Sequence, residues 1–531
     1  MFVRLGAEWR CSWLMAFLYY LAVTGFPLSK VHAKHDNSIR QARPLLIINE
    51  DNSHFFLTRR PEDMTVAGLN AWVDQYVGTA VSHLFLCPNA MRANFRSHTR
   101  DAIWDPVEGK KPQNIWPQNA KRLFEKGIDP YKVWISRSRQ KGLSPWLSMR
   151  MNDVHEANNI HSFMHSTFWR SHPEYWRVPK STSGPWTDRA LDYSRPEVWK
   201  YEFAFVRELL ERYDPDGLEL DWMRFGYHLP PGKERENAHV LTEFVRRVRE
   251  LTKCKAVERG HPIHLGVRVP THPDAAAGLG MDAVLWGKEG LVDMIVPSPF
   301  WASSDFDIPI ELWQKRLGSS ARRIQIVPSI EYQSRPWPGA AAVPNDVACV
   351  RGFAAAAYYR GAQGIYLFNW MDSQTRPVRA SVYSAMLHKG FRPQDLVSAF
   401  RRHPVCYRDT VPSGFPNDIQ LPVEAYVGKT FRIHIGARPK RGSASVVVGL
   451  AGDNPHNPLQ LIAFVNGKKI GTQRPFTELF RLGGRPTKGV QFPCRLSVLH
   501  DGNNEVTVRQ KKAERSGWKI VWVELQINGE N

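Results

Sequence analysis

The sequence predicts an α/β fold, a (β/α)8 barrel of the TIM type, followed by a C-terminal all-β sandwich. Strand-like and helix-like segments alternate from residue 45 to residue 371. Several of the strands carry polar residues on one face and Leu, Ile, Val or Met on the other, as a barrel with a polar mouth requires. After about residue 405 the helical periodicity ends, and strands joined by Gly and Asn turns follow.

The eight strands of the barrel are expected in short apolar runs, at 45–49, 81–89, 146–153, 217–222, 263–269, 292–298, 323–331 and 364–370. Between them apolar residues repeat with helical period, for example over 66–77 and 345–360, and a polar helix is expected near 119–141. The capping-box pattern Ser194-Arg-Pro-Glu197 predicts where another helix begins. A doubly wound sheet is the alternative, but no strand is followed by a Gly-rich phosphate loop.

The 531 residues divide into three expected parts. Residues 1–33 contain Arg4, Arg10, an apolar run over 12–26 and a small-residue cleavage site, a pattern typical of a secretory signal peptide. An N-terminal anchor helix is the alternative. We expect the barrel over 34–400 and the sandwich over 401–531, as a carbohydrate-binding accessory domain or as a structural cap. The mature protein is expected to be secreted or periplasmic, without a membrane span.

The chain is basic, with a formal net charge of +20. An exported basic protein suits an anionic partner such as a sulfated or uronic polysaccharide, although a generally basic surface would give the same charge. No nucleic-acid-binding motif accompanies the charge, so no nucleic-acid partner is expected. The 19 Trp include several in predicted loops, where indoles can stack on sugar rings or simply pack: Trp104, Trp116, Trp169 and Trp186.

No metal or cofactor is expected. The cysteines beyond the leader form no C-x-x-C pair, which argues against a Cys-type zinc site and leaves room for one or two disulfides. His155, His161 and His165 lie close in sequence, but HEANN (155–159) lacks the second His of the H-E-x-x-H zinc motif.

The fourth strand, in DGLELDWMRFGYH (216–228), places Glu219 and Asp221 on one face and Trp222 on the other, toward the helices. Ser148 lies on the polar face of the third strand and Arg268 on that of the fifth. Burying unpaired charge is costly, so these carboxylates are expected to be paired or to take part in chemistry. Catalytic groups of barrels gather at the carboxyl ends of strands, where Asp221 ends strand four and Glu331 ends strand seven, across the barrel. Hydrolysis of a glycosidic bond needs two carboxyl groups, and we predict Asp221 as nucleophile or general base and Glu331 as general acid.

The alternative for Asp221 is a structural ion pair with Arg224 or Arg268. Glu219 lies one pleat deeper and is expected to pair with Arg150 or Arg268, which would lower its pKa. Both arginines could also recognise a carboxylate or a sulfate by bidentate contact. For every further candidate for substrate contact, ordinary packing is the alternative: Glu219, Arg224, Arg150, Asn152, Asp153, His155, Arg268, His272, Trp301, Asn369 and Trp370.

DGLELDWMRF resembles the fourth-strand motif DGxxxDxxR of the bacterial glycosyl hydrolase-like family ten, and it is similar to the strand of retaining α-glycosidases that carries an Asp nucleophile. The resemblance implies a carbohydrate-active TIM barrel with Asp221 as nucleophile. SMRMNDVH (148–155) is similar to segments of secreted bacterial proteins of the same kind. The chitinase pattern DGxDxDxE matches only in part, because Met223 replaces its acid, and this departure argues against substrate-assisted chemistry.

These observations together predict a secreted glycoside hydrolase that acts on an oligo- or polysaccharide. A non-catalytic glycan-binding barrel is the alternative. Two carboxyl groups about 5–10 Å apart across an open cleft would favour the enzyme, and carboxyl groups sealed into arginine pairs would favour the binding protein.

Overall fold

The computed structural model describes residues 44–372, 379–452, 459–512 and 515–530. The predicted signal peptide, residues 1–33, therefore lies outside the described residues. Within these ranges no helix is long and apolar enough to cross a membrane. Cys87, Cys349, Cys406 and Cys494 are free thiols, so no disulfide joins any of these four residues.

A curled parallel sheet forms the larger part of the chain, with strand order β7-β6-β5-β4-β3-β2-β1-β11-β8. Every predicted strand position carries a strand, and the seventh is divided in two. The bounds are β1 Leu45–Glu50, β2 His83–Leu86, β3 Ser144–Arg150, β4 Gly217–Asp221, β5 His264–Pro270, β6 Met294–Ser298, β7 Gln325–Ile326, β8 Ser329–Glu331 and β11 Gly364–Phe368.

The two outermost strands of this sheet, β7 and β8, are consecutive in the chain and are separated only by Val327 and Pro328. β7 pairs with β6, and β8 pairs with β11 on the opposite side of the sheet. Pro328 has no N–H group to donate, so it interrupts the ladder of backbone hydrogen bonds at this point. The predicted barrel is therefore present as a curled nine-stranded sheet and not as a closed cylinder of eight unbroken strands.

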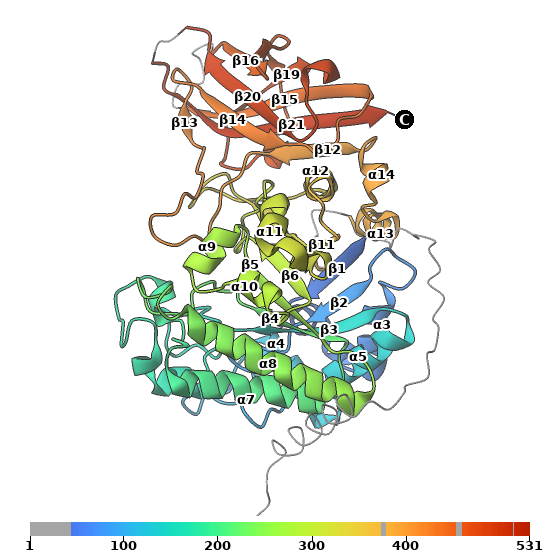
Figure 1. Cartoon of the computed structure of the whole chain (residues 1–531), viewed down its shortest axis with the longest axis vertical. Helices are drawn as coiled ribbons and strands as arrows, with labels where there is room; N and C mark the ends of the chain where they lie inside the picture. Colours follow the sequence, from blue (N-terminus) through green and yellow to red (C-terminus); the bar gives the residue numbers. More distant parts are fainter. Residues whose placement is uncertain (1–43, 373–378, 453–458, 513–514, 531) are drawn as a thin grey trace, which may run out of the picture.

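Helices surround the curled sheet, and the long helices α7 and α8 lie side by side on its outer face (Figure 1). The polar helix predicted near 119–141 is two helices, because Gly127 adopts a positive φ of 69° and Asp129 caps the second one. The bounds are α2 His54–Thr58, α3 Val66–Asp74, α4 Ile115–Glu125, α5 Pro130–Gln140, α6 Thr167–Ser171, α7 Pro196–Arg212, α8 Ala238–Arg259, α9 Pro273–Gly278, α10 Ala283–Lys288, α11 Ile310–Leu317, α12 Val347–Tyr359, α13 Ala380–Lys389 and α14 Pro393–Leu396.

The predicted capping box at the start of α7 is wrong. The helix begins at Pro196 with Arg195 at the N-cap position, and no side chain caps it. The hydroxyl of Ser194 instead donates to both carboxylate oxygens of Asp192, at 2.7 and 2.8 Å.

Two apolar cores lie on the two faces of the curled sheet. The outer core packs the strands against the helices and contains Trp222, as expected from the alternation in the fourth strand. The inner core is smaller and is centred on Trp146, Phe85 and Tyr366. Trp146 lies beside Gly217, where a Cβ would come within 2.4 Å of the indole, so the strand needs glycine at this position.

Two antiparallel sheets form the C-terminal part and share one hydrophobic core. The sequence pattern predicts strands within 423–437, 443–451, 459–470, 495–510 and 518–527, and it misses β12, β18 and β19. The first sheet contains β12 Phe400–Pro404, β13 Val423–Glu424, β15 Arg441–Gly452, β18 Arg474–Pro475, β19 Lys488–Cys494 and β21 Trp518–Glu530, and the second contains β14 Lys429–His434, β16 Leu461–Val465, β17 Lys468–Lys469 and β20 Asn503–Gln510. A separate small hairpin joins β9 Gln333–Ser334 to β10 Val343–Pro344.

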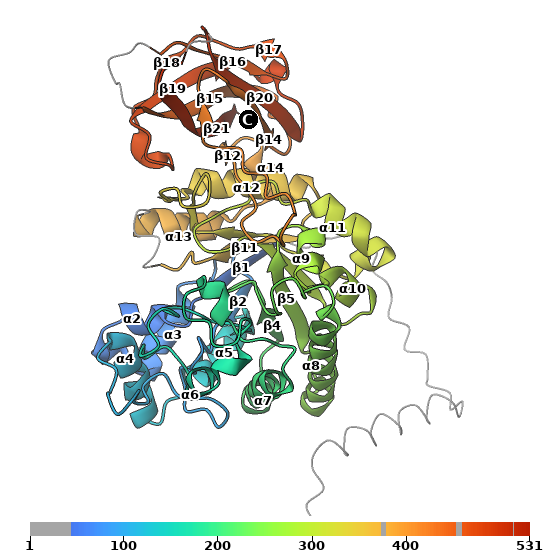
Figure 2. The same cartoon turned by 90° about the vertical axis from the view of Figure 1, so that its left-hand side faces the viewer.

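The two parts of the chain meet where β12 lies against α12 (Figures 1 and 2). Gly352 of α12 approaches the carbonyl of Arg402 so closely that a Cβ would lie 1.9 Å from its oxygen. Arg402 is buried and donates to Glu524 of β21 at 2.7 Å and to Asp346, the N-cap of α12, at 2.9 Å. Buried ion pairs and close backbone packing therefore join the antiparallel sheets to the helix layer.

Candidate active site

Asp221, the last residue of β4, is buried at the carboxyl ends of the parallel strands. Arg268 of the neighbouring strand β5 binds it at two points, Nε to Oδ1 at 2.8 Å and Nη2 to Oδ2 at 3.0 Å. The backbone N–H groups of Met223 and Arg224 also donate to Oδ1, at 3.0 and 2.9 Å. The ion pair with Arg268, one of the two alternatives given by the sequence, is therefore formed.

Glu331 ends β8 and is 1% exposed. Its carboxyl group accepts hydrogen bonds from Nδ2 of Asn369 at 2.6 Å and from the backbone N–H of Gln333 at 2.7 Å. Burial is the main influence and raises the pKa of Glu331 to about 7, although these hydrogen bonds oppose the rise. A large fraction of this carboxyl group is therefore protonated near neutral pH.

Asn369 adopts a positive φ of 60°, a backbone conformation that asparagine tolerates better than most residues. This turn directly after β11 aims its amide at Glu331. Asn369, predicted to contact substrate, is thus a hydrogen-bond partner of the carboxyl group of Glu331.

The predicted pairing of Glu219 with Arg150 or Arg268 is wrong. Glu219 accepts hydrogen bonds from the hydroxyl of Ser148 at 2.6 Å and from the hydroxyl of Tyr366 at 3.0 Å, both inside the curled sheet. Burial and the nearby charge of Asp221 raise its pKa to about 8, whereas the sequence led us to expect a lowered value. Glu219 is therefore a neutral carboxylic acid beneath Asp221.

Arg150 is not free to bind substrate, because it forms ion pairs with Asp51 and with Asp153, the latter at 2.9 Å. Asp153 also contacts Nδ1 of His155 at 2.7 Å, and Nε2 of His155 lies 2.9 Å from Nη2 of Arg224. Burial favours the neutral form of Asp51 and Asp153. The contacts with His155 and Ser53 and the charges of Arg150 and Arg224 nevertheless lower both pKa values well below the usual range. These five residues, Asp51, Arg150, Asp153, His155 and Arg224, form one charged network, which we call the strand-three network.

Three other predicted contact residues have structural roles instead. Asn152 donates from its amide to the carbonyl of Leu191 at 3.0 Å and accepts from the N–H of Leu191 at 2.9 Å, so it ties a loop to the end of β3. His272 is the N-cap of α9 and accepts from the N–H of Asp274. Trp370 is fully buried in the outer core.

Trp301 is the predicted aromatic that faces solvent. Its side chain is 54% exposed, and the guanidinium of Arg335 lies 5.6 Å from its ring. Trp301 follows directly on Phe300, which is half-buried and stacks on Trp186 with ring centroids 5.5 Å apart. Phe225 contacts Phe300 at 5.7 Å and the edge of His155 at 4.8 Å, so aromatic rings extend from the surface to the strand-three network.

We call Trp186, Phe225 and Phe300 the aromatic cluster. Sequence reasoning noted Trp186 only as one of several loop tryptophans, because nothing in a single chain shows which loops meet. The other three loop tryptophans, Trp104, Trp116 and Trp169, are buried.

A second polar group at the strand ends also escaped sequence reasoning. His54 lies between Glu50 of β1 and Asp372, which follows β11, with ring nitrogens 2.5 and 3.0 Å from the two carboxylates. Burial opposes the charged form of His54, but the charge of Glu50 and the hydrogen bond to Asp372 raise its pKa to about 9. The available indication was the acidic pair Glu50-Asp51 directly after the first strand.

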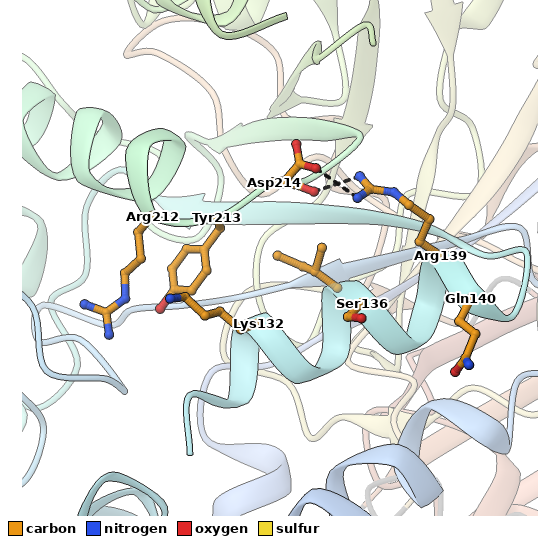
Figure 3. Close-up of a pocket in the computed structure, with 8 residues that line it drawn as sticks. Lys132, Ser136, Arg139, Gln140, Arg212, Tyr213 and Asp214 are labelled. Carbon is orange, nitrogen blue, oxygen red and sulfur yellow. Dashed lines mark hydrogen bonds and ion pairs between the residues drawn. The ribbon is translucent and has the colours of Figure 1, made fainter. Parts of the chain in front are cut away.

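One cavity lies away from these groups. It has a volume of about 490 Å³ and lies between α5 and the segment that connects α7 to β4 (Figure 3). Arg139 and Asp214 form an ion pair of 3.0 Å there. Arg139 lies shortly before β3 in the chain, and Asp214 lies shortly before β4. The cavity is therefore at the amino ends of the strands, opposite the candidate site, and its lining carries Lys132, Arg139 and Arg212 against the single carboxylate of Asp214.

No protein-family model and no curated protein matches the sequence. Among solved structures, the chain is similar to a cycloisomaltooligosaccharide glucanotransferase from Paenibacillus sp., with 9% identity over 90% of this chain and 57% of that chain and a TM-score of 0.32. It is also similar to α-L-fucosidase isoenzyme 2 from Paenibacillus thiaminolyticus, with 10% identity over 65% and 49% and a TM-score of 0.41.

A further similar structure is a putative α-L-fucosidase from Bacteroides thetaiotaomicron, with 10% identity over 92% of this chain and 95% of that chain and a TM-score of 0.36. The chain spans about half the length of the first two structures. All three of these solved structures are of carbohydrate-active enzymes. Membership of the glycosyl hydrolase-like family ten stays a prediction.

Proposed function

We propose that the protein is a glycoside hydrolase acting on an oligo- or polysaccharide, with Glu331 as general acid and Asp221 as nucleophile or general base. The supporting observation is that two buried carboxyl groups at the carboxyl ends of the strands lie in opposite environments. Glu331 forms no ion pair with any described residue and has a pKa raised to about 7, whereas Asp221 is ion-paired with Arg268. A glycosidase needs one carboxyl group that carries a proton and one that is ionised.

In this proposal Glu331 donates its proton to the glycosidic oxygen as the bond to the leaving group breaks. Asp221 then either bonds to the anomeric carbon or takes a proton from the attacking water. Oδ1 of Asp221 accepts three hydrogen bonds, whereas Oδ2 accepts only one from the residues that the structure describes. Oδ2 therefore has a lone pair free for the reaction, and Arg268 holds the carboxylate in place.

The second candidate function is glycan binding without catalysis. It is favoured by the exposure of Asp221, only 2%, and by its two-point contact with Arg268. A sealed carboxylate of this kind can be purely structural. The aromatic cluster and Trp301 would then provide the surface that holds the sugar.

A polysaccharide-hydrolysis screen with separate binding measurements distinguishes the two candidates. Wild type, Asp221→Asn and Glu331→Gln are compared with Glu250→Gln, an exposed change on α8. Cleavage of a glycan by wild type and the control, with turnover lowered by orders of magnitude in both active-site variants, supports the hydrolase. Binding without cleavage, unchanged in both variants, supports the binding protein, and near-wild-type turnover in either variant refutes the corresponding role.

We also propose that residues 1–33 direct export and are removed. The amino-terminal sequence of the protein recovered from outside the cytoplasm tests this directly, since a mature chain beginning near residue 34 is expected. For the antiparallel sheets we propose a role as a structural cap, supported by the buried contacts of Arg402 with Asp346 and Glu524.

A further inference from the structure

Three arginines lie at the carboxyl ends of neighbouring strands, and their partners differ. Arg150 pairs with Asp51 and Asp153, and Arg268 pairs with Asp221. Arg224 forms no ion pair with any residue in the described part of the chain. Its backbone N–H contacts Asp221, but its guanidinium donates only to the imidazole of His155.

The contact between Arg224 and His155 fixes the state of the imidazole. A guanidinium can only donate, so Nε2 of His155 must accept the hydrogen bond from Nη2 of Arg224. The proton of the neutral ring then sits on Nδ1, which lies 2.7 Å from Asp153 and donates to it. His155 therefore holds the guanidinium in place as a hydrogen-bond acceptor and does not neutralise its charge.

Arg224 is buried, with 8% of the residue exposed. Its Nε is buried without a hydrogen-bond partner, and its Nη1 donates to none of the described residues. Its guanidinium carbon lies 5.8 Å from the centroids of Phe225 and of Phe368. Unfilled donors on a buried cation are unfavourable, and such a group calls for an explanation in the function of the site.

The neighbours of Arg224 include an imidazole and aromatic rings of the kind that bind sugars. His155 is half-buried, and Phe225 links it to Phe300 and so to the rest of the aromatic cluster. The exposed Trp301 follows Phe300 in the chain. Aromatic faces accept the apolar faces of sugar rings, and a guanidinium binds carboxylate or sulfate oxygens with strong charge-assisted hydrogen bonds. A sugar lying on these rings would turn an acidic substituent toward Arg224.

We propose that Arg224 is a specificity residue for an anionic sugar, one that bears a carboxylate or a sulfate ester, and that its unfilled N–H groups bind that substituent. The inference rests on the proposed function and names its substrate class. The competing explanation is that Arg224 has a structural role only. Asp51 and Asp153 both pair with Arg150, and the positive charge of Arg224 would offset the second of these two negative charges.

Equilibrium binding to the full chain, measured by calorimetry at neutral pH, tests this inference. The probes are D-glucuronate, D-glucose 6-sulfate and D-glucose, and the proteins are wild type, Arg224→Gln, Arg224→Lys and Arg247→Gln. Arg247 lies exposed on α8 and pairs only with Glu243 and Glu250 among the described residues, so its replacement removes the same charge far from the site. The carboxylate and sulfate probes distinguish the two sources of the anion.

Wild type and Arg247→Gln are expected to bind at least one anionic sugar about tenfold or more tightly than glucose. Arg224→Gln should lose this preference, and Arg224→Lys should keep part of it. Equal affinity of wild type for all three sugars overturns the inference, as does an unchanged preference in folded Arg224→Gln. The wild-type comparison needs no variant, so the test holds even if Arg224→Gln does not fold.

Failure of this inference is distinguishable from failure of the proposed function. Cleavage of a neutral glycan that is unchanged in Arg224→Gln but abolished in Glu331→Gln would refute the inference and still support the proposed hydrolase function. Binding of an anionic sugar that depends on Arg224, without any cleavage, would support the inference and refute the proposed catalysis.

Discussion

Asp221 and Arg268 occupy paired positions on adjacent strands, β4 and β5, and share two hydrogen bonds of 2.8 and 3.0 Å in the interior of the protein. Arg268 also donates to the hydroxyl of Ser298 at 2.7 Å, and its guanidinium lies 3.9 Å from the ring centroid of Phe368. The pair joins β4, β5, β6 and β11 at one point. It therefore supports the fold as well as the charge of the proposed catalytic carboxylate.

Asp221→Asn is expected to destabilise the protein as well as to lower turnover. Removing one partner of a buried ion pair leaves the other charge uncompensated, at a cost of about 3 kcal/mol. Urea unfolding at pH 7 measures the loss, and the double variant Asp221→Asn/Arg268→Met should recover much of it. Glu289→Gln, which breaks an exposed pair with Arg246, is the control and should cost no more than about 0.5 kcal/mol. If Asp221→Asn and Glu289→Gln lowered the free energy of unfolding by the same amount, the structural role of the Asp221–Arg268 pair would be contradicted.

Glu331 should set the alkaline limb of the pH profile of hydrolysis. The general acid must carry a proton, and burial raises its pKa to about 7, so kcat should fall as the pH rises through about 7. Glu331→Gln should lower kcat by about 10²-fold to 10⁴-fold and remove this limb. Initial rates between pH 5 and pH 9 measure both effects. A limb that persists in the variant would assign the acid to another residue.

Glu219 should make the protein less stable as the pH rises. Its folded-state pKa is raised to about 8, above the ordinary value of 4.5, so the native state holds a proton that the unfolded chain releases in this interval. The stabilisation is complete below about pH 4.5 and is lost as the pH rises through about 8. Glu219→Gln should therefore show a smaller difference in the free energy of unfolding between pH 5.5 and pH 8.5 than wild type.

The hydrogen bonds of Glu219 make this substitution informative. A glutamine carbonyl can still accept from Ser148 and Tyr366, so little stability should be lost at pH 5.5. Glu250→Gln on the surface of α8 should keep the wild-type difference between the two pH values. If Glu219→Gln also keeps it, Glu219 is ionised in the native protein at neutral pH.

Trp301 and Trp370 should respond to truncation in opposite ways. Trp301→Ala removes an exposed ring, so stability should change by no more than about 0.5 kcal/mol, while affinity for the cognate glycan falls about threefold to tenfold. Trp370→Ala empties a fully buried position and should cost about 3–5 kcal/mol. Thermal unfolding and glycan binding measure the two effects. Unchanged glycan affinity in Trp301→Ala would exclude this ring from the binding surface.

The alternation within single strands made much of the fold predictable. In β3, β4 and β5 it placed Ser148, Glu219 and Arg268 on the inner face and Trp222 on the outer face, as the structure has them. The break between β7 and β8 was not predicted, because the run over 323–331 reads as one strand and only the partners on each side divide it.

The candidate site was predictable by residue type but not by partner. Asp221, Glu331 and Arg224 were found as polar residues at strand ends. Which arginine binds Asp221 depends on the register of β4 against β5, and a single sequence does not give that register. The aromatic cluster was missed for the same reason, since Trp186, Phe225 and Phe300 come from three different segments.

The sequence alone determined the alternation of strands and helices in the curled sheet, the inward and outward faces of its third, fourth and fifth strands, and the carboxyl groups at the strand ends. Local periodicity carries this information, because side chains alternate along a strand and repeat along a helix. Only the tertiary structure decided that Arg268 binds Asp221, that burial raises the pKa of Glu219 and that Arg224 keeps unfilled donors. Pairing and pKa depend on distance and burial between segments far apart in the chain, and these exist only once the chain has folded.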